Sequence, residues 1–162
     1  MQPVIVDMPS RKFVGLGTKF ISILAPGEKP SNAIPQLWHN WQQRSGEIRH
    51  RVSMAAYGLV EMLGAQEKSH PHELFYMAAA EVSDVSGQPA GMISRVVPAG
   101  KYAKFVHKGK LTGLGATYQA IHTQWFPKSG MQRRPAPDIE VYDQRFKMDQ
   151  DDSEFDILIP VA

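Results

Sequence analysis

The sequence contains no cysteine, which excludes disulfide bridges, thiol nucleophiles and cysteine-ligated metal centres. It also lacks any apolar run that approaches the roughly 20 residues of a membrane-spanning helix. Neither sign of charge dominates: 18 Lys and Arg residues against 16 Asp and Glu residues leave a net charge of +2, too little for a general nucleic-acid binder. The first residues show no signal-peptide pattern, so we expect a cytoplasmic protein without direct DNA or membrane binding.

Recognisable metal and cofactor motifs are also missing. The nearest approach to a metal site is His70-Pro71-His72-Glu73. Adjacent positions around a proline rarely converge on one ion, so turn histidines are the better interpretation. The Gly-x-Gly pairs at 15–17 and 113–115 lack the third glycine of a dinucleotide-binding loop. We therefore expect no metal and no cofactor.

The pattern of apolar residues predicts a single α+β domain over residues 1–162, a length that can bury a sizeable core. Alternating and β-branched stretches predict strands. Helical spacing predicts two helices, near 32–45 and 113–126. The predicted strands cover residues 4–6, 13–23, 53–60, 73–82, 92–97, 102–107, 139–146 and 155–161.

These elements repeat. Trp41-x-x-x-Ser45-Gly46 recurs as Trp125-x-x-x-Ser129-Gly130, an offset of 125 − 41 = 84, and Tyr57 matches Tyr142 at an offset of 85. The repeat predicts two β-α-β-β halves, about 3–83 and 91–161. We expect them to form an antiparallel sheet with pseudo-two-fold symmetry, helices on one side and a ligand cleft between the halves. Chance similarity of two short runs is the alternative.

One predicted strand, Asp138 to Phe146, carries an unusual face. Side chains alternate along a strand, so Glu140, Tyr142, Gln144 and Phe146 share one face, which holds a carboxylate and two aromatic rings but no cation. A buried carboxylate without a partner is costly. Glu140 is therefore either exposed at the start of the strand or kept for a ligand.

The sequence resembles the GyrI-like effector-binding domain, a family shared by DNA gyrase inhibitory protein and by the ligand-sensing halves of AraC-type and multidrug-responsive MerR-type activators. The resemblance is strongest over residues 91–161 and covers nearly the whole chain. It rests on the segments Val97-Pro98-Ala99-Gly100-Lys101-Tyr102-Ala103-Lys104-Phe105, Trp125-Phe126-Pro127-Lys128-Ser129-Gly130, Pro137-Asp138-Ile139-Glu140-Val141-Tyr142 and Asp152-Ser153-Glu154-Phe155-Asp156-Ile157-Leu158-Ile159-Pro160-Val161.

The resemblance implies the same tandem fold and a ligand site. In multidrug-sensing members, the Glu two residues before the Tyr lies at the bottom of an aromatic pocket between the halves, and Glu140 occupies that position. Matched position implies Tyr142 and Trp125 as pocket walls, and the pseudo-symmetry adds Tyr57, Tyr76 and Trp38. Because the two halves use all 162 residues, we expect no helix-turn-helix in this chain.

A carboxylate among aromatic rings favours a cationic or amphipathic small molecule. We therefore expect a stand-alone binding domain with no catalytic residues. Two alternatives stay open. One is a hydrolase of strained electrophiles, with Glu140 as base and Tyr57 or Tyr76 as proton donor. The other is a protein that acts on a protein partner, as the gyrase-inhibitory relative does, or that forms a homodimer. The aromatic residues Trp41, Phe13, Phe105 and Phe155 are expected in the core.

Overall fold

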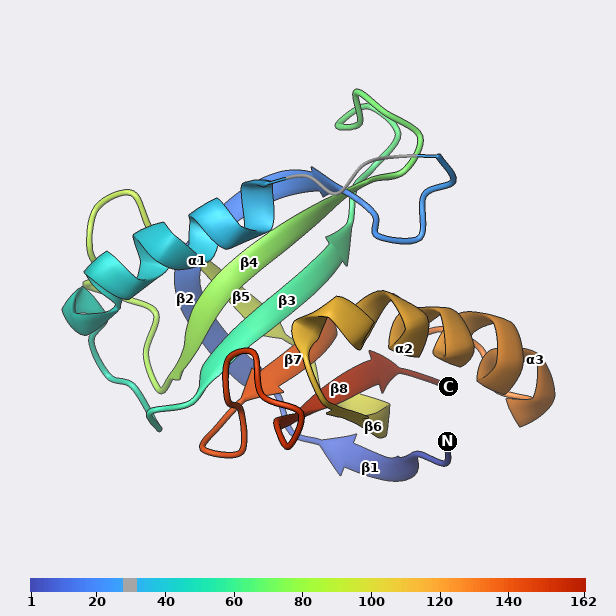
Figure 1. The fold of residues 1–162 in the computed structure, drawn as a ribbon. Coiled ribbons are helices and arrows are strands. Elements are labelled where there is room, and N and C mark those ends of the chain that lie inside the picture. Colours follow the sequence, from blue (N-terminus) through green and yellow to red (C-terminus); the bar gives the residue numbers. More distant parts are fainter. Residues whose placement is uncertain (28–31) are drawn as a thin grey trace.

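The computed structural model describes residues 1–27 and 32–162. Eight strands form one antiparallel sheet, and two helical segments lie on it (Figure 1). The strands are β1 (Val4–Met8), β2 (Arg11–Ile21), β3 (Ala56–Met62), β4 (Glu73–Val82), β5 (Ile93–Val97), β6 (Gly100–Lys108), β7 (Asp138–Tyr142) and β8 (Glu154–Pro160). The helical segments are α1 (Ala33–Arg44) with the 3-10 turn Ser45–Glu47, and α2 (Leu114–Ala120) with the 3-10 turn Leu111–Gly113 before it and the π-helical turn Ile121–Trp125 and α3 (Phe126–Ser129) after it.

The strand order is symmetric about the centre of the sheet. It reads β1-β6-β8-β7-β3-β4-β2-β5, so each strand of the first half has a counterpart at the mirrored position in the second half. The two central strands, β7 and β3, pair antiparallel across the pseudo-two-fold axis. The predicted α+β class and the duplicated, pseudo-symmetric architecture are confirmed, and each half has one strand more than the predicted β-α-β-β pattern, because its order is β-β-α-β-β.

The first strand of each half pairs with the other half. β1 pairs with β6, and β5 pairs with β2. Only Pro9 and Ser10 separate β1 from β2, although these strands are first and seventh in the sheet. Six strand spacings span roughly 29 Å, whereas three extended peptide steps reach about 11 Å. The sheet must therefore curl until its two ends approach each other.

Alternation along the strands divides the core into two faces. The face under the helices holds two clusters, one around α1 with Leu37 and Trp41, and one around α2 with Tyr118 and Ile121. The opposite face carries no helix of the described residues, and the curl closes it over a third cluster. That cluster consists of Phe13, Tyr57, Leu59, Met77, Ala79, Val97, Tyr102, Ile139 and Leu158.

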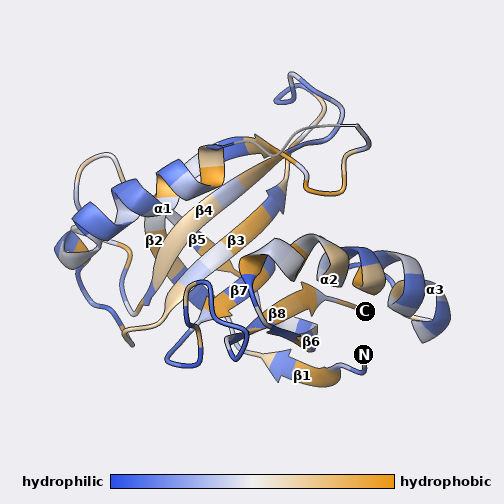
Figure 2. Cartoon of the chain, in the orientation of Figure 1, coloured by the Kyte–Doolittle hydropathy of each residue, from blue (hydrophilic) through white to orange (hydrophobic). Residues whose placement is uncertain are grey.

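Hydropathy differs between the central strands and the segments around them. Figure 2 shows hydrophobic residues along β7 and β8, whereas α1 and the loop between β7 and β8 are largely hydrophilic. The four aromatic residues predicted for the core are all buried, which confirms that prediction: Trp41, Phe13, Phe105 and Phe155. Among the residues described, no helix is long and apolar enough to span a membrane.

The strand predicted to run to Phe146 ends at Tyr142 instead. The Asp143 carboxylate accepts hydrogen bonds from the backbone N–H and the guanidinium of Arg145, a local turn that competes with strand pairing. Phe146 nevertheless returns to Tyr142, with ring centroids 4.9 Å apart. The turn therefore preserves the contact that strand alternation predicted.

The second predicted helix is not a continuous α-helix. Its middle is the π-helical turn Ile121–Trp125, which places one extra residue in a turn. At 3.6 residues per turn, one extra residue rotates all later side chains by about 100°. Tyr118 and Trp125 nevertheless pack against the same core cluster on the sheet.

The cluster on the face opposite the helices, called the far face below, leads to a stability prediction. Leu59 is fully buried on β3, whereas Met62, on the same strand, is 71% exposed. We expect Leu59→Ala to lower the free energy of unfolding by about 2–5 kcal/mol through lost burial and a residual cavity. Met62→Ala should stay within about 0.5 kcal/mol of the wild type. Urea unfolding of both variants checks this, and equal losses would contradict the closed far face.

Candidate functional site

Glu140 lies in the middle of the sheet under the helices, and three tyrosines point their hydroxyls at it. Oε1 accepts hydrogen bonds from Tyr76 at 2.7 Å and from Tyr142 at 3.0 Å. Oε2 accepts a hydrogen bond from Tyr118 at 2.7 Å. These four residues, called the Glu140 cluster below, come from β4, β7 and α2. Glu140 is only 3% exposed.

The register of the central strands creates the space for this cluster. Glu140 pairs with Gly58 on β3 and with Ile157 on β8, which fixes its side chain on the helix face. A Cβ atom at Gly58 would lie 2.1 Å from the Tyr76 hydroxyl oxygen and 2.6 Å from Glu140 Oε1. Only glycine at this position lets the tyrosine and the carboxylate meet.

The Glu140 carboxylate lacks an ion-pair partner among the residues described. In residues 1–27 and 32–162, no lysine or arginine forms an ion pair with it. Burial raises the pKa of Glu140, and the hydrogen bonds from the tyrosines, followed by the charge of His107, oppose this shift. Burial also raises the pKa of Tyr76, Tyr118 and Tyr142 well above the usual value, and the neighbouring Glu140 charge adds to the effect. The tyrosines therefore stay neutral and act as donors.

Aromatic rings surround the cluster. The Trp38 indole N–H, on α1, donates to the Tyr76 hydroxyl at 3.3 Å. The half-buried Trp38 ring meets Tyr76 and Tyr142 edge to face, at centroid distances of 6.2 and 5.6 Å. Phe20 approaches Tyr76 at 6.0 Å, and Phe146 covers Tyr142. Trp38 thus connects the first half to the second above the carboxylate.

Four of the six residues predicted for the site are brought together: Glu140, Tyr142, Tyr76 and Trp38. Tyr57 is not among them, because it lies on the opposite face of the sheet, against Phe13 at 5.2 Å. There its hydroxyl accepts a hydrogen bond from Arg11 at 3.1 Å. The sequence match of Tyr57 with Tyr142 used an offset of 85, one more than that of the helices. A shift of one residue moves a side chain to the other face.

Trp125 also lies apart from the Glu140 cluster. Its ring packs against Phe105 at 5.1 Å and Phe126 at 5.0 Å. It lines a separate surface hollow of about 340 Å³ that also includes Met1 and Lys128. Trp125 follows Tyr118 by seven residues, which places it roughly 10 Å further along the helical segment than the residue that contacts Glu140.

Tyr118 takes the place predicted for Trp125, and sequence reasoning did not select it. A usable signal was present, because Tyr118 lies on the apolar stripe of the helix three residues before Ile121. A tyrosine on a stripe that faces the core needs a partner for its hydroxyl. Glu140 is the acceptor on the strand below.

A second buried carboxylate lies on the same strand face. Asp138 is two residues before Glu140 and is 5% exposed. Arg133 donates a short hydrogen bond to it and forms an ion pair with it. Burial raises the pKa of Asp138 to about 6, Arg133 opposes the shift, and Glu140 adds to it. The structure thus contains one paired and one unpaired carboxylate side by side.

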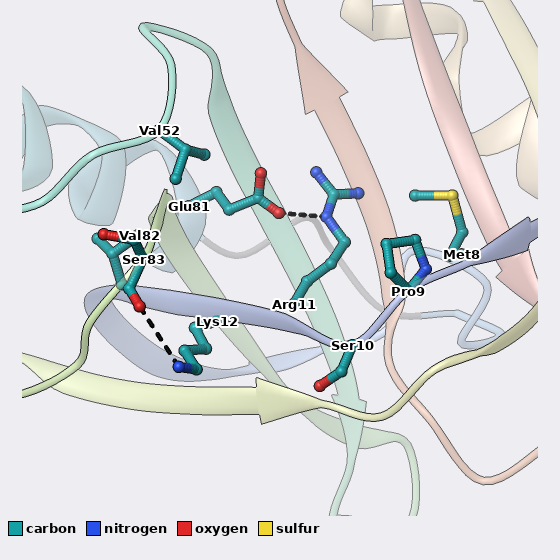
Figure 3. A pocket seen from close by; sticks show the side chains of 9 residues that line it. All are labelled: Met8, Pro9, Ser10, Arg11, Lys12, Val52, Glu81, Val82 and Ser83. Carbon is teal, nitrogen blue, oxygen red and sulfur yellow. Dashed lines mark hydrogen bonds and ion pairs between the residues drawn. The ribbon is translucent and has the colours of Figure 1, made fainter.

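The far face carries its own hollow, of about 510 Å³, near the turn between β1 and β2 (Figure 3). Arg11 points into this region and is held by an ion pair with Glu81. This arrangement satisfies both charges locally, unlike that of Glu140.

Among the residues described, no group of three or more histidine, aspartate or glutamate side chains is arranged to hold a metal ion.

Comparisons with known proteins agree with this architecture. The chain matches the family model of the GyrI-like small molecule binding domain over residues 1–162, and it belongs to that family. The transcriptional regulator BrlR of Pseudomonas aeruginosa is 33% identical over 164 residues, which cover 99% of this chain and 56% of the regulator. The chain thus spans about half the length of this curated relative.

Solved structures share the fold. SAV2435 bound to tetraphenylphosphonium gives a TM-score of 0.71 at 18% identity, covering 100% of this chain and 94% of that chain. The C-terminal domain of EcmrR gives 0.69 at 19% identity, with 99% and 97% covered. A hydrolase from Listeria innocua gives 0.55 at 12% identity, with 99% and 92% covered. At these identities the similarity establishes the fold alone.

The raised pKa of Asp138 generates a prediction about stability and pH. The folded protein binds this proton more tightly than the unfolded chain, so the contribution of Asp138 to stability is lost as pH rises from the ordinary value of 3.8 through about 6. Across this window the wild type should lose about 2–3 kcal/mol relative to Asp138→Asn. Urea unfolding at several pH values checks this, and parallel curves for the two proteins would contradict it.

Proposed function

We propose that the Glu140 cluster is a receptor for hydrophobic, aromatic cations. The observation that carries the proposal is a buried carboxylate with three hydroxyl donors and no ion-pair partner in the described part of the chain. Hydroxyl donors satisfy the hydrogen-bonding needs of the oxygens, but they leave the net charge uncompensated in a poorly hydrated site. A ligand cation supplies that compensation and excludes neutral or anionic competitors.

The surrounding rings support the same ligand class. A cation near the face of a Trp or Tyr ring gains about 0.5–2 kcal/mol. Trp38 and Tyr142 supply such rings beside the carboxylate, and Phe20 and Phe146 extend the apolar surface. We infer that a ligand reaches Glu140 by displacing the half-buried Trp38. The tetraphenylphosphonium bound to SAV2435, which shares this fold, is an aromatic cation.

A hydrolase is the second candidate, because Glu140 with a tyrosine could act as base and acid. The geometry favours binding. Burial and the Glu140 charge raise the pKa of Tyr76 and Tyr118, which makes them weaker proton donors. Both carboxylate oxygens already accept tyrosine hydroxyls, which hold Glu140 as an acceptor rather than a base directed at water. Tyr57, the other proposed donor, lies on the far face.

The receptor role predicts a charge-dependent loss in Glu140→Gln, which keeps the size of the side chain and removes its charge. We expect tetraphenylphosphonium to lose about 1.5–3 kcal/mol of binding free energy, the scale of a charge-assisted contact. Neutral triphenylphosphine oxide should lose much less. Cation affinity in the wild type should fall as pH falls, because protons compete for Glu140, whose pKa is raised by burial. Titration calorimetry measures both effects.

Glu47→Gln is the matched control, since it removes the same charge from an exposed site at the end of α1. It should leave both affinities unchanged. Folding of Glu140→Gln should be unharmed or slightly improved, because an unpaired buried charge disappears. Equal losses for the cation and the neutral compound, or none for either, would show that Glu140 is not the cation receptor.

The binding role also predicts no sustained turnover of simple esters, because the chain has no cysteine and no activated serine nucleophile is evident in the sequence. Product formation is followed over many equivalents of substrate for the wild type and Glu140→Gln. Multiple-turnover hydrolysis that is abolished in Glu140→Gln would favour the enzyme over the receptor.

A further inference from the structure

Asp138 and Glu140 form a pair of buried carboxylates on one face of β7, and the pair is only half neutralised. Two residues along a strand lie roughly 7 Å apart on the same face. Both carboxylates act on the Tyr118 hydroxyl, since the charges of Glu140 and Asp138 each raise the pKa of Tyr118. Asp138 is paired with Arg133, whereas Glu140 has only hydroxyl partners.

The backbone holds Arg133 in place. Arg133 forms a β-bridge with Val161, and its neighbours pair with the chain end: the backbone N–H groups of Gln132 and Ala162 donate to each other's carbonyls at 3.1 and 2.9 Å. Bridge partners share a face, and Val161 belongs to the helix-side core. The Arg133 side chain, 29% exposed, is therefore fixed beside the cluster as an internal cation.

We propose that the Arg133–Asp138 ion pair sets the number of positive charges that a ligand can carry: Arg133 masks Asp138 and leaves one free negative charge, at Glu140. The proposal rests on cation binding at Glu140. A ligand with one charge matches the free carboxylate. A second cationic centre meets Arg133, whose like charge repels it, so dications gain nothing from Asp138. Removing Arg133 would turn Asp138 into a second receptor at a pH high enough to keep it ionised, since Arg133 opposes the rise in its pKa.

Two probes of similar planar two-ring shape test this. The first is 1-methyl-4-phenylpyridinium, with one charge, and the second is methyl viologen, with two. In the wild type, methyl viologen should bind no more tightly than the monocation. In Arg133→Met, the affinity ratio should shift toward methyl viologen by about tenfold or more, the scale of one charge-assisted contact. Adding Asp138→Asn to Arg133→Met should abolish the shift.

Arg134→Met is the matched control. It removes the same charge one residue away, but Arg134 lies over the Tyr102 ring at 5.0 Å and donates to the Lys101 carbonyl at 3.2 Å, whereas the ion pair of Asp138 is with Arg133. It should leave the ratio at its wild-type value. An equal shift in Arg134→Met, or no shift in Arg133→Met, would overturn the proposal.

Asp138→Asn alone provides a second test that does not need Arg133→Met to fold. It leaves the Arg133 charge uncompensated, so both cations should bind several-fold more weakly, methyl viologen the more so. Unchanged affinities would overturn the proposal. Failure of the receptor role itself has a different signature, because Glu140→Gln would then leave binding of the monocation as it was.

Discussion

The structure depends on a negative charge, that of Glu140, which is buried without an ion-pair partner in residues 1–27 and 32–162. Taking a carboxylate out of water is expensive, and hydrogen bonds offset only part of the cost. Glu140 receives three hydroxyl donors, from β4, from α2 and from its own strand β7, so its polar atoms are satisfied while its charge is not. This combination defines the site: the protein is organised around a carboxylate whose charge is left uncompensated by the residues described.

The fold places that carboxylate at the junction of the two halves. β7 and β3 meet at the pseudo-two-fold axis, and Glu140 lies directly across from Gly58. Applying the helix offset of 84 to the strands matches Glu140 with Ala56 and Tyr142 with Gly58. The second half thus contributes the acid and a ring, and the first half contributes small residues that make room for them. A duplicated scaffold has become asymmetric at its centre.

The buried carboxylates of this protein are neutralised to different extents. Arg11 and Glu81 neutralise each other on the far face, and Arg133 neutralises Asp138 on the helix face. Glu140 stands apart because its partners are neutral hydroxyls whose raised pKa values keep them protonated. The difference between these sites, rather than the presence of buried acids as such, distinguishes a receptor from a structural ion pair.

Much of the fold and part of the candidate site could be predicted from local sequence patterns. Alternation and helical spacing identified the strands and both helical segments, and the recurrence of Trp-x-x-x-Ser-Gly indicated the duplicated architecture. Glu140 was also within reach, because a carboxylate among rings on one strand face, with no cation beside it, is a local property. The segment from Asp143 to Phe146 was assigned as strand because a side-chain turn at Asp143 is not visible in an alternating pattern.

The register between distant strands and the position along the second helical segment determined which aromatic residues contact Glu140. Whether Tyr57 or Gly58 faces Glu140 depends on a single residue of register between β3 and β7, and a similarity that tolerates offsets of 84 and 85 cannot distinguish two opposite faces. Tyr118 rather than Trp125 reaches the carboxylate because Trp125 lies seven residues, or roughly 10 Å, further along the same helical segment. The sequence alone identified Glu140 as a carboxylate among aromatic rings. Tertiary packing determined which residues contact it, because the hydroxyl donors come from segments up to 64 residues away.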